Sequence, residues 1–129
     1  MNIQAVCERY HISQDTLRYY EKAGVIPAVS RTKGGKRDYR EEDLKWVENA
    51  ICMRNAGLSI EMLAEYVRLF QEGNDTFSQR RDLLIDAREQ IQKQKEEIEE
   101  TLSLLDYKIS RYEEAVKTGV LTWDEKHPR

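Results

Sequence analysis

The chain has 129 residues, 35% of them charged, with a formal net charge of −3 and a mean hydropathy of −0.78. This length allows one domain, or a small domain with one long element, and the charge content predicts much helix surface in solvent. No apolar run approaches the length of a membrane span, and the first residues lack the apolar segment of a signal peptide, so we expect a cytoplasmic protein without a membrane partner.

Cysteines and histidines form no pattern typical of a disulfide framework or a metal site. Cys7 and Cys52 lie far apart and lack the C-x-x-C spacing, which argues against a zinc cluster and agrees with a reducing compartment. His11 and His127 are equally distant from each other. We therefore expect neither a bound metal nor another cofactor.

Two short helices are expected at the start of the chain. Residues 3–10 carry apolar side chains at helical spacing. Only His11 and Ile12 separate them from Ser13, a good N-cap for a second helix that Gly24 can close. Glycine is usual in such a turn, but histidine also tolerates a positive φ. Helix, short turn and helix form the helix-turn-helix pattern.

The second helix carries hydrogen-bonding and charged side chains, and Leu17 alone is clearly inward-facing. Such side chains suit the phosphate oxygens and base edges that a major groove presents. Taken alone, however, the stretch fits a surface helix with two half-buried tyrosines equally well. The side chains concerned are those of Gln14, Thr16, Arg18, Tyr19 and Tyr20.

Residues 28–40 predict a small β-hairpin. Val29 and Tyr39 favour strands, and residues 33–36, which include Lys33 and Lys36, supply a turn with two glycines. The range 16–40 holds seven basic and two acidic residues, the local positive charge expected of a surface that faces DNA. A hairpin of this kind beside a recognition helix is a wing; a solvated charged loop is the alternative.

Two further helices are expected over residues 41–57 and 59–70. Three acids in the first turn of the earlier helix suit its positive dipole end, and Ser59 caps the later one. Their apolar stripes, with the first two helices, predict a bundle with a modest core. Arg54 lies where the dipole favours a cation, and it is equally placed to reach a phosphate.

Residues 77–117 predict one long helix of about 60 Å, without Pro or Gly, and Thr76 to Gln79 predict a capping box at its start. Its apolar residues recur every seven positions as an imperfect coiled-coil seam. The helix needs a partner, and an antiparallel coiled coil between identical chains is the economical solution, since the helix is too long to fold back on the bundle. The seam residues are Leu84, Ile91, Ile98, Leu105 and Tyr112.

The predicted fold class is all-α with a small β-hairpin wing. A winged helix-turn-helix DNA-binding lobe is expected over residues 1–74, a coiled-coil dimerisation helix over 75–118, and a loose tail with Trp123 as its anchor over 119–129. An enzyme is not expected, because the sequence has no nucleophile constellation, carboxylate pair or phosphate loop. A dimeric coiled-coil adaptor that binds a protein partner is the alternative, although it would not need a cluster of cations beside paired tyrosines.

Together these motifs resemble the MerR family of bacterial transcription regulators. The resemblance implies that Arg18, Tyr19, Tyr20 and Arg37 contact DNA, that Tyr39 supports the wing or contacts the backbone, and that Arg54 touches a phosphate. With the polar side chains of the second helix and the cations of the turn, the predicted DNA-binding surface consists of Ser13, Gln14, Thr16, Arg18, Tyr19, Tyr20, Lys33, Lys36, Arg37, Tyr39 and Arg54. The matching segments are Ser13-x-x-Thr16-Leu17-Arg18-Tyr19-Tyr20-Glu21, Arg37-x-Tyr39, Glu42-Asp43-Leu44 and Gly57-Leu58-Ser59-Ile60.

The resemblance also implies a mechanism and a sensor. A homodimer would bind a palindromic promoter operator and distort the spacer between two RNA polymerase elements, which makes promoter DNA and the polymerase expected partners. The AdhR/NmlR-type regulators of aldehyde and thiol stress are the subgroup that the chain resembles, in residues 51–54 and 106–112. This makes Cys52 a candidate sensor of an electrophile, with a small core residue as the alternative reading.

Overall fold

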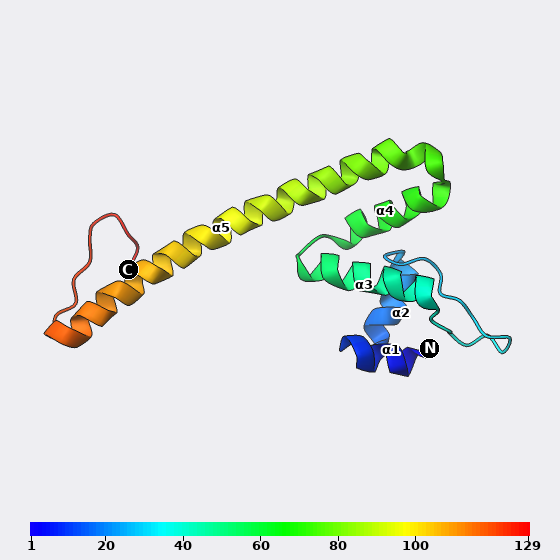
Figure 1. The fold of residues 1–129 in the computed structure, drawn as a ribbon, viewed down its shortest axis with the longest axis horizontal. Coiled ribbons are helices and arrows are strands. Elements are labelled where there is room, and N and C mark those ends of the chain that lie inside the picture. Colours follow the sequence, from blue (N-terminus) through cyan, green and yellow to red (C-terminus); the bar gives the residue numbers. More distant parts are fainter. The chain divides into compact units, whose positions relative to one another are not determined.

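The computed structural model describes residues 1–129 as a helical chain that divides into two compact units, Met1–Ala87 and Arg88–Arg129. No helix in it combines the length and the apolar character that crossing a membrane requires. The elements in chain order are α1 (Ile3–Tyr10), α2 (Gln14–Ala23), α3 (Glu41–Asn55), α4 (Ile60–Glu72), the 3₁₀ turn η1 (Asn74–Thr76) and α5 (Phe77–Thr118) (Figure 1).

The helix-turn-helix prediction is confirmed by α1, α2 and the turn between them. His11 is the one non-glycine residue with a positive φ, 54°, and it caps α1 in the left-handed conformation. The Ser13 hydroxyl accepts a hydrogen bond from the Thr16 N–H at 3.0 Å and so caps α2. Gly24, at φ 80°, ends α2 as predicted. Local sequence alone therefore sets both ends of α2.

A core beneath α2 holds the first unit together. Val6 of α1, Leu17 of α2 and Val47 of α3 are fully buried, and the segment that follows α2 adds three buried side chains, Val25, Ile26 and Val29. Burial of these apolar surfaces supplies the main stabilising free energy of the unit. It also fixes the orientation of α2, because only one face of that helix enters the core.

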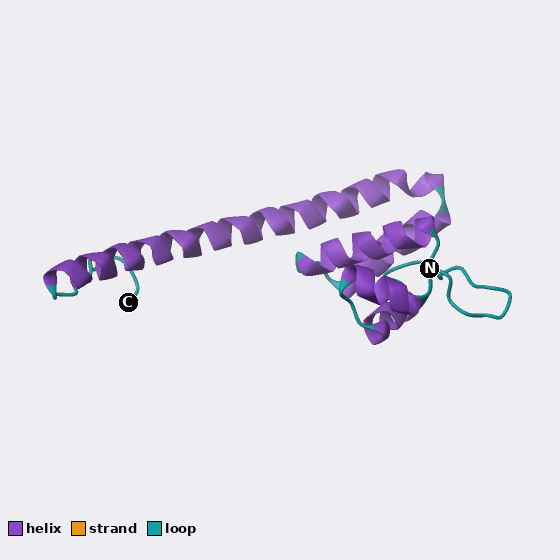
Figure 2. Cartoon of the chain, turned by 60° about the horizontal axis from the view of Figure 1, so that its bottom comes forward, coloured by secondary structure: helices purple, strands orange, loops and turns teal.

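The expected two-stranded hairpin is not formed, and residues 28–40 are a loop that folds back on itself with one antiparallel bridge, between Arg31 and Arg37. Figure 2 shows the loop projecting from the helices with no strand in it. On either side of the bridge the Thr32 N–H donates to the Lys36 carbonyl (2.8 Å) and the Asp38 N–H donates to the Ser30 carbonyl (2.7 Å). The pairing stops there, because the next N–H that would face the other arm, that of Arg40, donates to an Asp43 carboxylate oxygen (2.9 Å) at the start of α3. The outward-facing N–H groups of Val29 and Tyr39 donate to a Glu21 carboxylate oxygen (2.8 Å) and to the Met1 carbonyl (2.7 Å).

The capping box predicted for Thr76 is also wrong. The Thr76 side chain is buried, and its hydroxyl lies 2.6 Å from the Leu69 carbonyl and 2.8 Å from the Gly73 carbonyl, both at the end of α4. The hydroxyl donates back to α4 instead of accepting a backbone N–H of α5. This threonine therefore closes one helix and does not cap the next.

The second unit is the greater part of α5 with the tail folded against it. Exposed apolar side chains follow α5, among them Ile98 (61% exposed) and Val116 (86%). The tail is not loose. The Asp124 N–H donates to the Tyr107 hydroxyl at 2.7 Å, and the Trp123 ring packs edge-on against Tyr112, with ring centroids 5.7 Å apart.

Candidate nucleic-acid interface

The outer face of α2 carries the polar side chains that the sequence singled out. Arg18 and Tyr19 are exposed, Tyr19 by 52%, and Gln14 and Thr16 are partly exposed. They lie within two turns of one another, because α2 buries its opposite face in the core. The face thus offers a guanidinium, a phenol, an amide and a hydroxyl, the groups that bind base edges and phosphates.

Arg18 is held in place by its own helix. Its Nη2 donates to the Gln14 amide oxygen at 3.0 Å, and its Nη1 lies 3.6 Å from the Asp15 carboxylate. Both partners are solvent-exposed or half-exposed, so these contacts are weak compared with a desolvated pair. The guanidinium is therefore pre-positioned and free to exchange these partners for a ligand.

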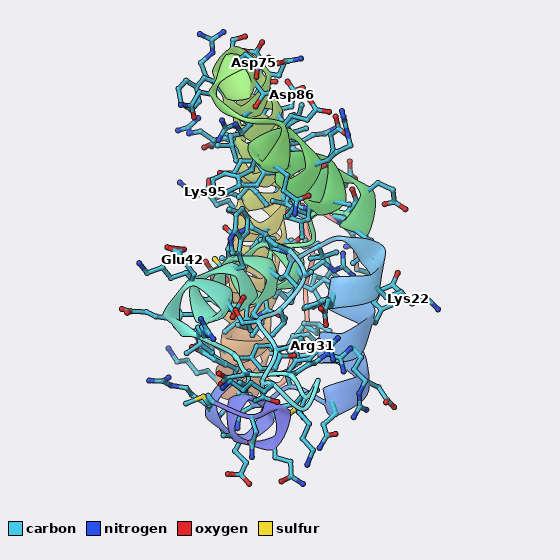
Figure 3. All side chains as sticks on the ribbon, turned by 90° about the vertical axis from the view of Figure 1, so that its right-hand side faces the viewer. Lys22, Arg31, Glu42, Asp75, Asp86 and Lys95 are labelled. Carbon is cyan, nitrogen blue, oxygen red and sulfur yellow. The ribbon has the colours of Figure 1, made fainter.

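The loop over residues 28–40 brings further cations to the same side of the unit. Lys33 and Lys36 are exposed at its turn, where the Thr32 N–H donates to the Lys36 carbonyl at 2.8 Å. Arg31 donates from Nη1 to the Gly35 carbonyl at 3.1 Å and so braces the loop across its width. In Figure 3, Lys22 projects outward from α2 and Arg31 lies on the loop beside that helix.

Glu21 ties the loop to α2. One oxygen of its carboxylate accepts Arg37 Nε at 2.7 Å, and the other accepts the Val29 N–H at 2.8 Å and lies 3.8 Å from Arg31 Nη2. The Glu21 side chain is only 12% exposed. Burial by itself would raise the pKa of Glu21, but the hydrogen bonds from Arg37 and Val29 and the charge of Arg31 outweigh it and hold the pKa below its usual range.

A depression of about 330 Å³ lies between the start of α1, α2 and the loop. Four of its lining side chains are cationic, and no lining residue is acidic. A concave surface with this charge attracts an anion such as a phosphate group. The lining residues are Asn2, Ile3, Arg18, Arg31, Gly35, Lys36 and Arg37.

Three predicted DNA contacts have roles inside the fold. Tyr20 (8% exposed) and Tyr39 (1% exposed) belong to the core, and the Tyr39 hydroxyl has no hydrogen-bond partner. Burial raises the pKa of Tyr39, so it stays a neutral phenol. Arg54 Nη1 donates to the Leu58 carbonyl at 2.7 Å and braces the turn after α3. Of the adjacent tyrosines, Tyr19 is exposed and Tyr20 is buried.

The two cysteines differ in exposure. Cys52 is exposed on α3, whereas Cys7 is half-buried, and burial raises the pKa of its thiol. No group of three or more His, Cys, Asp or Glu side chains is placed to hold a metal ion. Cys52 is thus the thiol that a reagent in solution meets first.

The sequence analysis missed the two residues that organise this surface, Glu21 and Arg31. In the sequence, Arg31 is one of the cations of residues 16–40, and Glu21 is one of the two acids there and the last residue of the recognition-helix motif. The available signal was an acid at the end of a recognition helix followed by a cluster of arginines. Spacing alone did not reveal which of the arginines it binds.

Comparison with known proteins places this surface in a family. The sequence model described as MerR HTH family regulatory protein matches residues 1–69. The chain is 52% identical to the HTH-type transcriptional regulator AdhR of Bacillus subtilis over 91 residues, 70% of this chain and 65% of that protein, so it matches less than two thirds of the relative's length. It is 32% identical to an HTH-type transcriptional regulator of Haemophilus influenzae, over 87% of this chain and 83% of that protein.

Solved structures show the same similarity. A protein from Listeria monocytogenes assigned to the MerR family has a TM-score of 0.84 at 41% identity, with 88% of this chain and 86% of that chain covered. HiNmlR, a MerR family regulator lacking the sensor domain and bound to promoter DNA, has a TM-score of 0.82 at 30% identity, with 92% and 94% covered. These proteins share both the helical unit and the long helix.

We predict that Glu21→Gln destabilises the protein in a pH-dependent way. Because the folded-state pKa of Glu21 lies below its unfolded value of about 4.5, its contribution to stability is complete at pH 7 and is lost as the pH falls through the folded-state pKa. Urea unfolding from pH 7 to pH 3 should show the wild type more stable at pH 7, and the difference should shrink once the pH falls below about 4.5, the unfolded value. A difference that stays constant across this range would contradict the ionic role of Glu21.

Proposed function

The chain belongs to the MerR family of helix-turn-helix transcriptional regulators, and on this premise we propose that it binds a palindromic promoter operator as a homodimer. The proposed surface is the outer face of α2 with the loop 28–40. Its direct contacts are Ser13, Gln14, Thr16, Arg18 and Tyr19 on the helix side and Lys33, Lys36 and Arg37 on the loop side, with Tyr20, Tyr39 and Arg54 supporting them from within the fold.

The observation that carries the proposal is the cationic depression beside an exposed recognition helix. Arg18 lines this depression and also stands on the helix, so the two features form one surface. The helix fits a major groove and the loop fits the adjacent backbone. Promoter DNA bound by HiNmlR, at 30% identity over most of both chains, supports the same ligand here.

Homodimerisation is proposed through α5. Its exposed apolar residues, including Leu84, Ile98, Leu105 and Tyr112, keep heptad spacing. A single chain leaves this stripe in water, and an antiparallel pair would bury it with two-fold symmetry. Such symmetry matches an operator with two inverted half-sites.

We further propose that the bound dimer activates or represses transcription by distorting the spacer between promoter elements read by RNA polymerase. Deforming DNA stores energy that depends on spacer length and sequence, so a rigid dimer can act as a switch. The resemblance to the MerR family supports this step. A protein-binding adaptor would leave the convergence of Arg18, Arg31, Lys36 and Arg37 on one depression unexplained.

Cys52 is the proposed sensor of a reactive aldehyde or another electrophile. It is exposed on α3, and adduct formation there adds bulk within the DNA-binding unit. Arg54 lies two residues after Cys52 and donates a hydrogen bond to the Leu58 carbonyl in the turn before α4. An adduct on Cys52 would lie close to this turn and could change its conformation. The resemblance to AdhR/NmlR-type regulators supports this assignment.

Arg18→Ala should lower affinity for a duplex that the wild type selects from a random library by about tenfold or more and relax its sequence preference. Lys33→Ala should give a smaller loss, equal for all sequences, with a shallower salt dependence. Electrophoretic mobility shifts measure both effects, with circular dichroism to verify the fold. Unchanged affinity in a folded Arg18→Ala protein would refute the proposed recognition surface.

Ile98→Lys should convert the dimer to a monomer, because it would bury two uncompensated cations in the seam. Ser103→Lys adds the same charge on the opposite side of α5 and should remain dimeric. Sedimentation velocity distinguishes the two species. A dimer of native mass for Ile98→Lys would rule out this seam.

Cys52→Ser should bind the selected duplex normally but lose the response to electrophiles in a reporter strain. Mass spectrometry after mild aldehyde or quinone treatment should find Cys52 modified before Cys7, because Cys52 is exposed and burial raises the pKa of the Cys7 thiol. Cys7→Ser is the matched control and should keep the response. A full response in Cys52→Ser would place the sensor elsewhere.

A further inference from the structure

Polar contacts hold the joint between α4 and α5, residues 69–80. The chain turns through Gly73 and η1, and the Thr76 N–H donates to the Gly73 carbonyl at 3.2 Å. The single hydroxyl hydrogen of Thr76 cannot fully satisfy the carbonyls of both Leu69 and Gly73, although both lie within 2.8 Å of its oxygen. A second hydrogen-bond donor is therefore needed if both carbonyls are to be fully satisfied.

Arg80 supplies that donor from the first turn of α5. Its Nη2 donates to the Gly73 carbonyl and its Nε to the Thr76 hydroxyl, each at 3.0 Å. Its Cζ lies 5.3 Å from the centre of the Phe70 ring and 4.7 Å from that of the Phe77 ring. One partly buried guanidinium thus contacts the end of α4, η1 and the start of α5.

Through Phe70, the contacts of Arg80 connect to helix α3. The Phe70 ring packs edge-on against Trp46 of α3, with ring centroids 5.0 Å apart. Phe70 and Phe77 are nevertheless 47% and 60% exposed, so the burial of their rings contributes little to holding the joint. The specific interactions that remain are the hydrogen bonds of Thr76 and the contacts of the Arg80 guanidinium.

Only an arginine fits these contacts. The planar fork of Arg80 makes two hydrogen bonds in fixed directions and stacks on aromatic faces, whereas a lysine ammonium is a point charge without either geometry. No carboxylate forms an ion pair with Arg80, so its charge has no structural counterion to require it. The planar shape of the Arg80 guanidinium, rather than its charge, is therefore what stabilises the joint.

We propose that Arg80 is a positioning residue that fixes the direction in which α5 leaves the DNA-binding unit and thereby the half-site spacing that the dimer accepts. The inference rests on the proposed function, since it requires two DNA-binding units joined through α5. One inserted base pair moves a half-site by about 3.4 Å and rotates it around the duplex. A rigid joint discriminates against that change, and a loosened joint tolerates it.

The first test needs no DNA. Arg80→Ala and Arg80→Lys are compared with Arg81→Ala, since Arg81 is the neighbouring arginine, 66% exposed and paired only with Asp82. Amide hydrogen exchange read by mass spectrometry over residues 69–80 should accelerate in both Arg80 variants and stay at the wild-type rate in Arg81→Ala. An unchanged exchange rate in Arg80→Ala would refute the claim that Arg80 stabilises the joint, whatever the DNA-binding results.

The second test measures spacing. The probe is a palindromic duplex that the wild type selects from a random library, together with copies that gain or lose one base pair between the half-sites. Discrimination between the spacings should fall by about fivefold or more in both Arg80 variants, with single half-site affinity unchanged, and should persist in Arg81→Ala.

Discrimination that persists in a folded Arg80→Ala protein with accelerated exchange would overturn the positioning role, because the joint would then be loose without effect on spacing. Restored discrimination in Arg80→Lys would overturn the argument from guanidinium shape. A wild-type protein that selects no duplex would instead overturn the proposed function, and the claim about spacing with it.

Discussion

The carboxylate of Glu21 is the interaction on which the candidate DNA-binding surface depends. It stands at the end of α2 and accepts hydrogen bonds from Arg37 and Val29, with Arg31 close by. Without this negative charge, two arginines would repel each other across a loop that has only one β-bridge to hold it. Its depressed pKa expresses the same coupling, because the cations stabilise the ionised form. The loop thus takes its position from α2.

The apolar side chains of the first unit and those of α5 differ in their exposure to solvent. In the first unit they are buried beneath α2, which leaves polar and cationic groups such as Arg18 and Lys36 facing outward. Along α5 many of them remain exposed at heptad spacing. The proposed DNA contacts and the proposed subunit contacts therefore lie on separate surfaces. The contacts of Thr76 and Arg80 hold the start of α5 to the end of α4, within the first unit.

Sequence reasoning predicted the helices and many of their ends, because these depend on local signals such as the Ser13 cap and the left-handed His11. It failed where a group found a distant partner. The Met1 carbonyl accepts the Tyr39 N–H along the outer edge of the loop, and Thr76 closes α4 rather than capping α5. The different exposure of Tyr19 and Tyr20, and the role of Glu21, likewise depend on packing that spacing does not reveal. The contacts with DNA and with a second subunit rest on the family and stay proposals.

The salt dependence of DNA binding tests the central claim most directly. Each subunit presents at least three exposed cations at the proposed surface, Arg18, Lys33 and Lys36, so a dimer that engages all of them neutralises about six phosphates. The logarithm of the binding constant for the selected duplex, plotted against the logarithm of salt concentration, should fall with a slope of about −5. A slope near zero, or equal affinity for an unrelated acidic polymer, would contradict a dimer that binds DNA through α2 and its neighbouring loop.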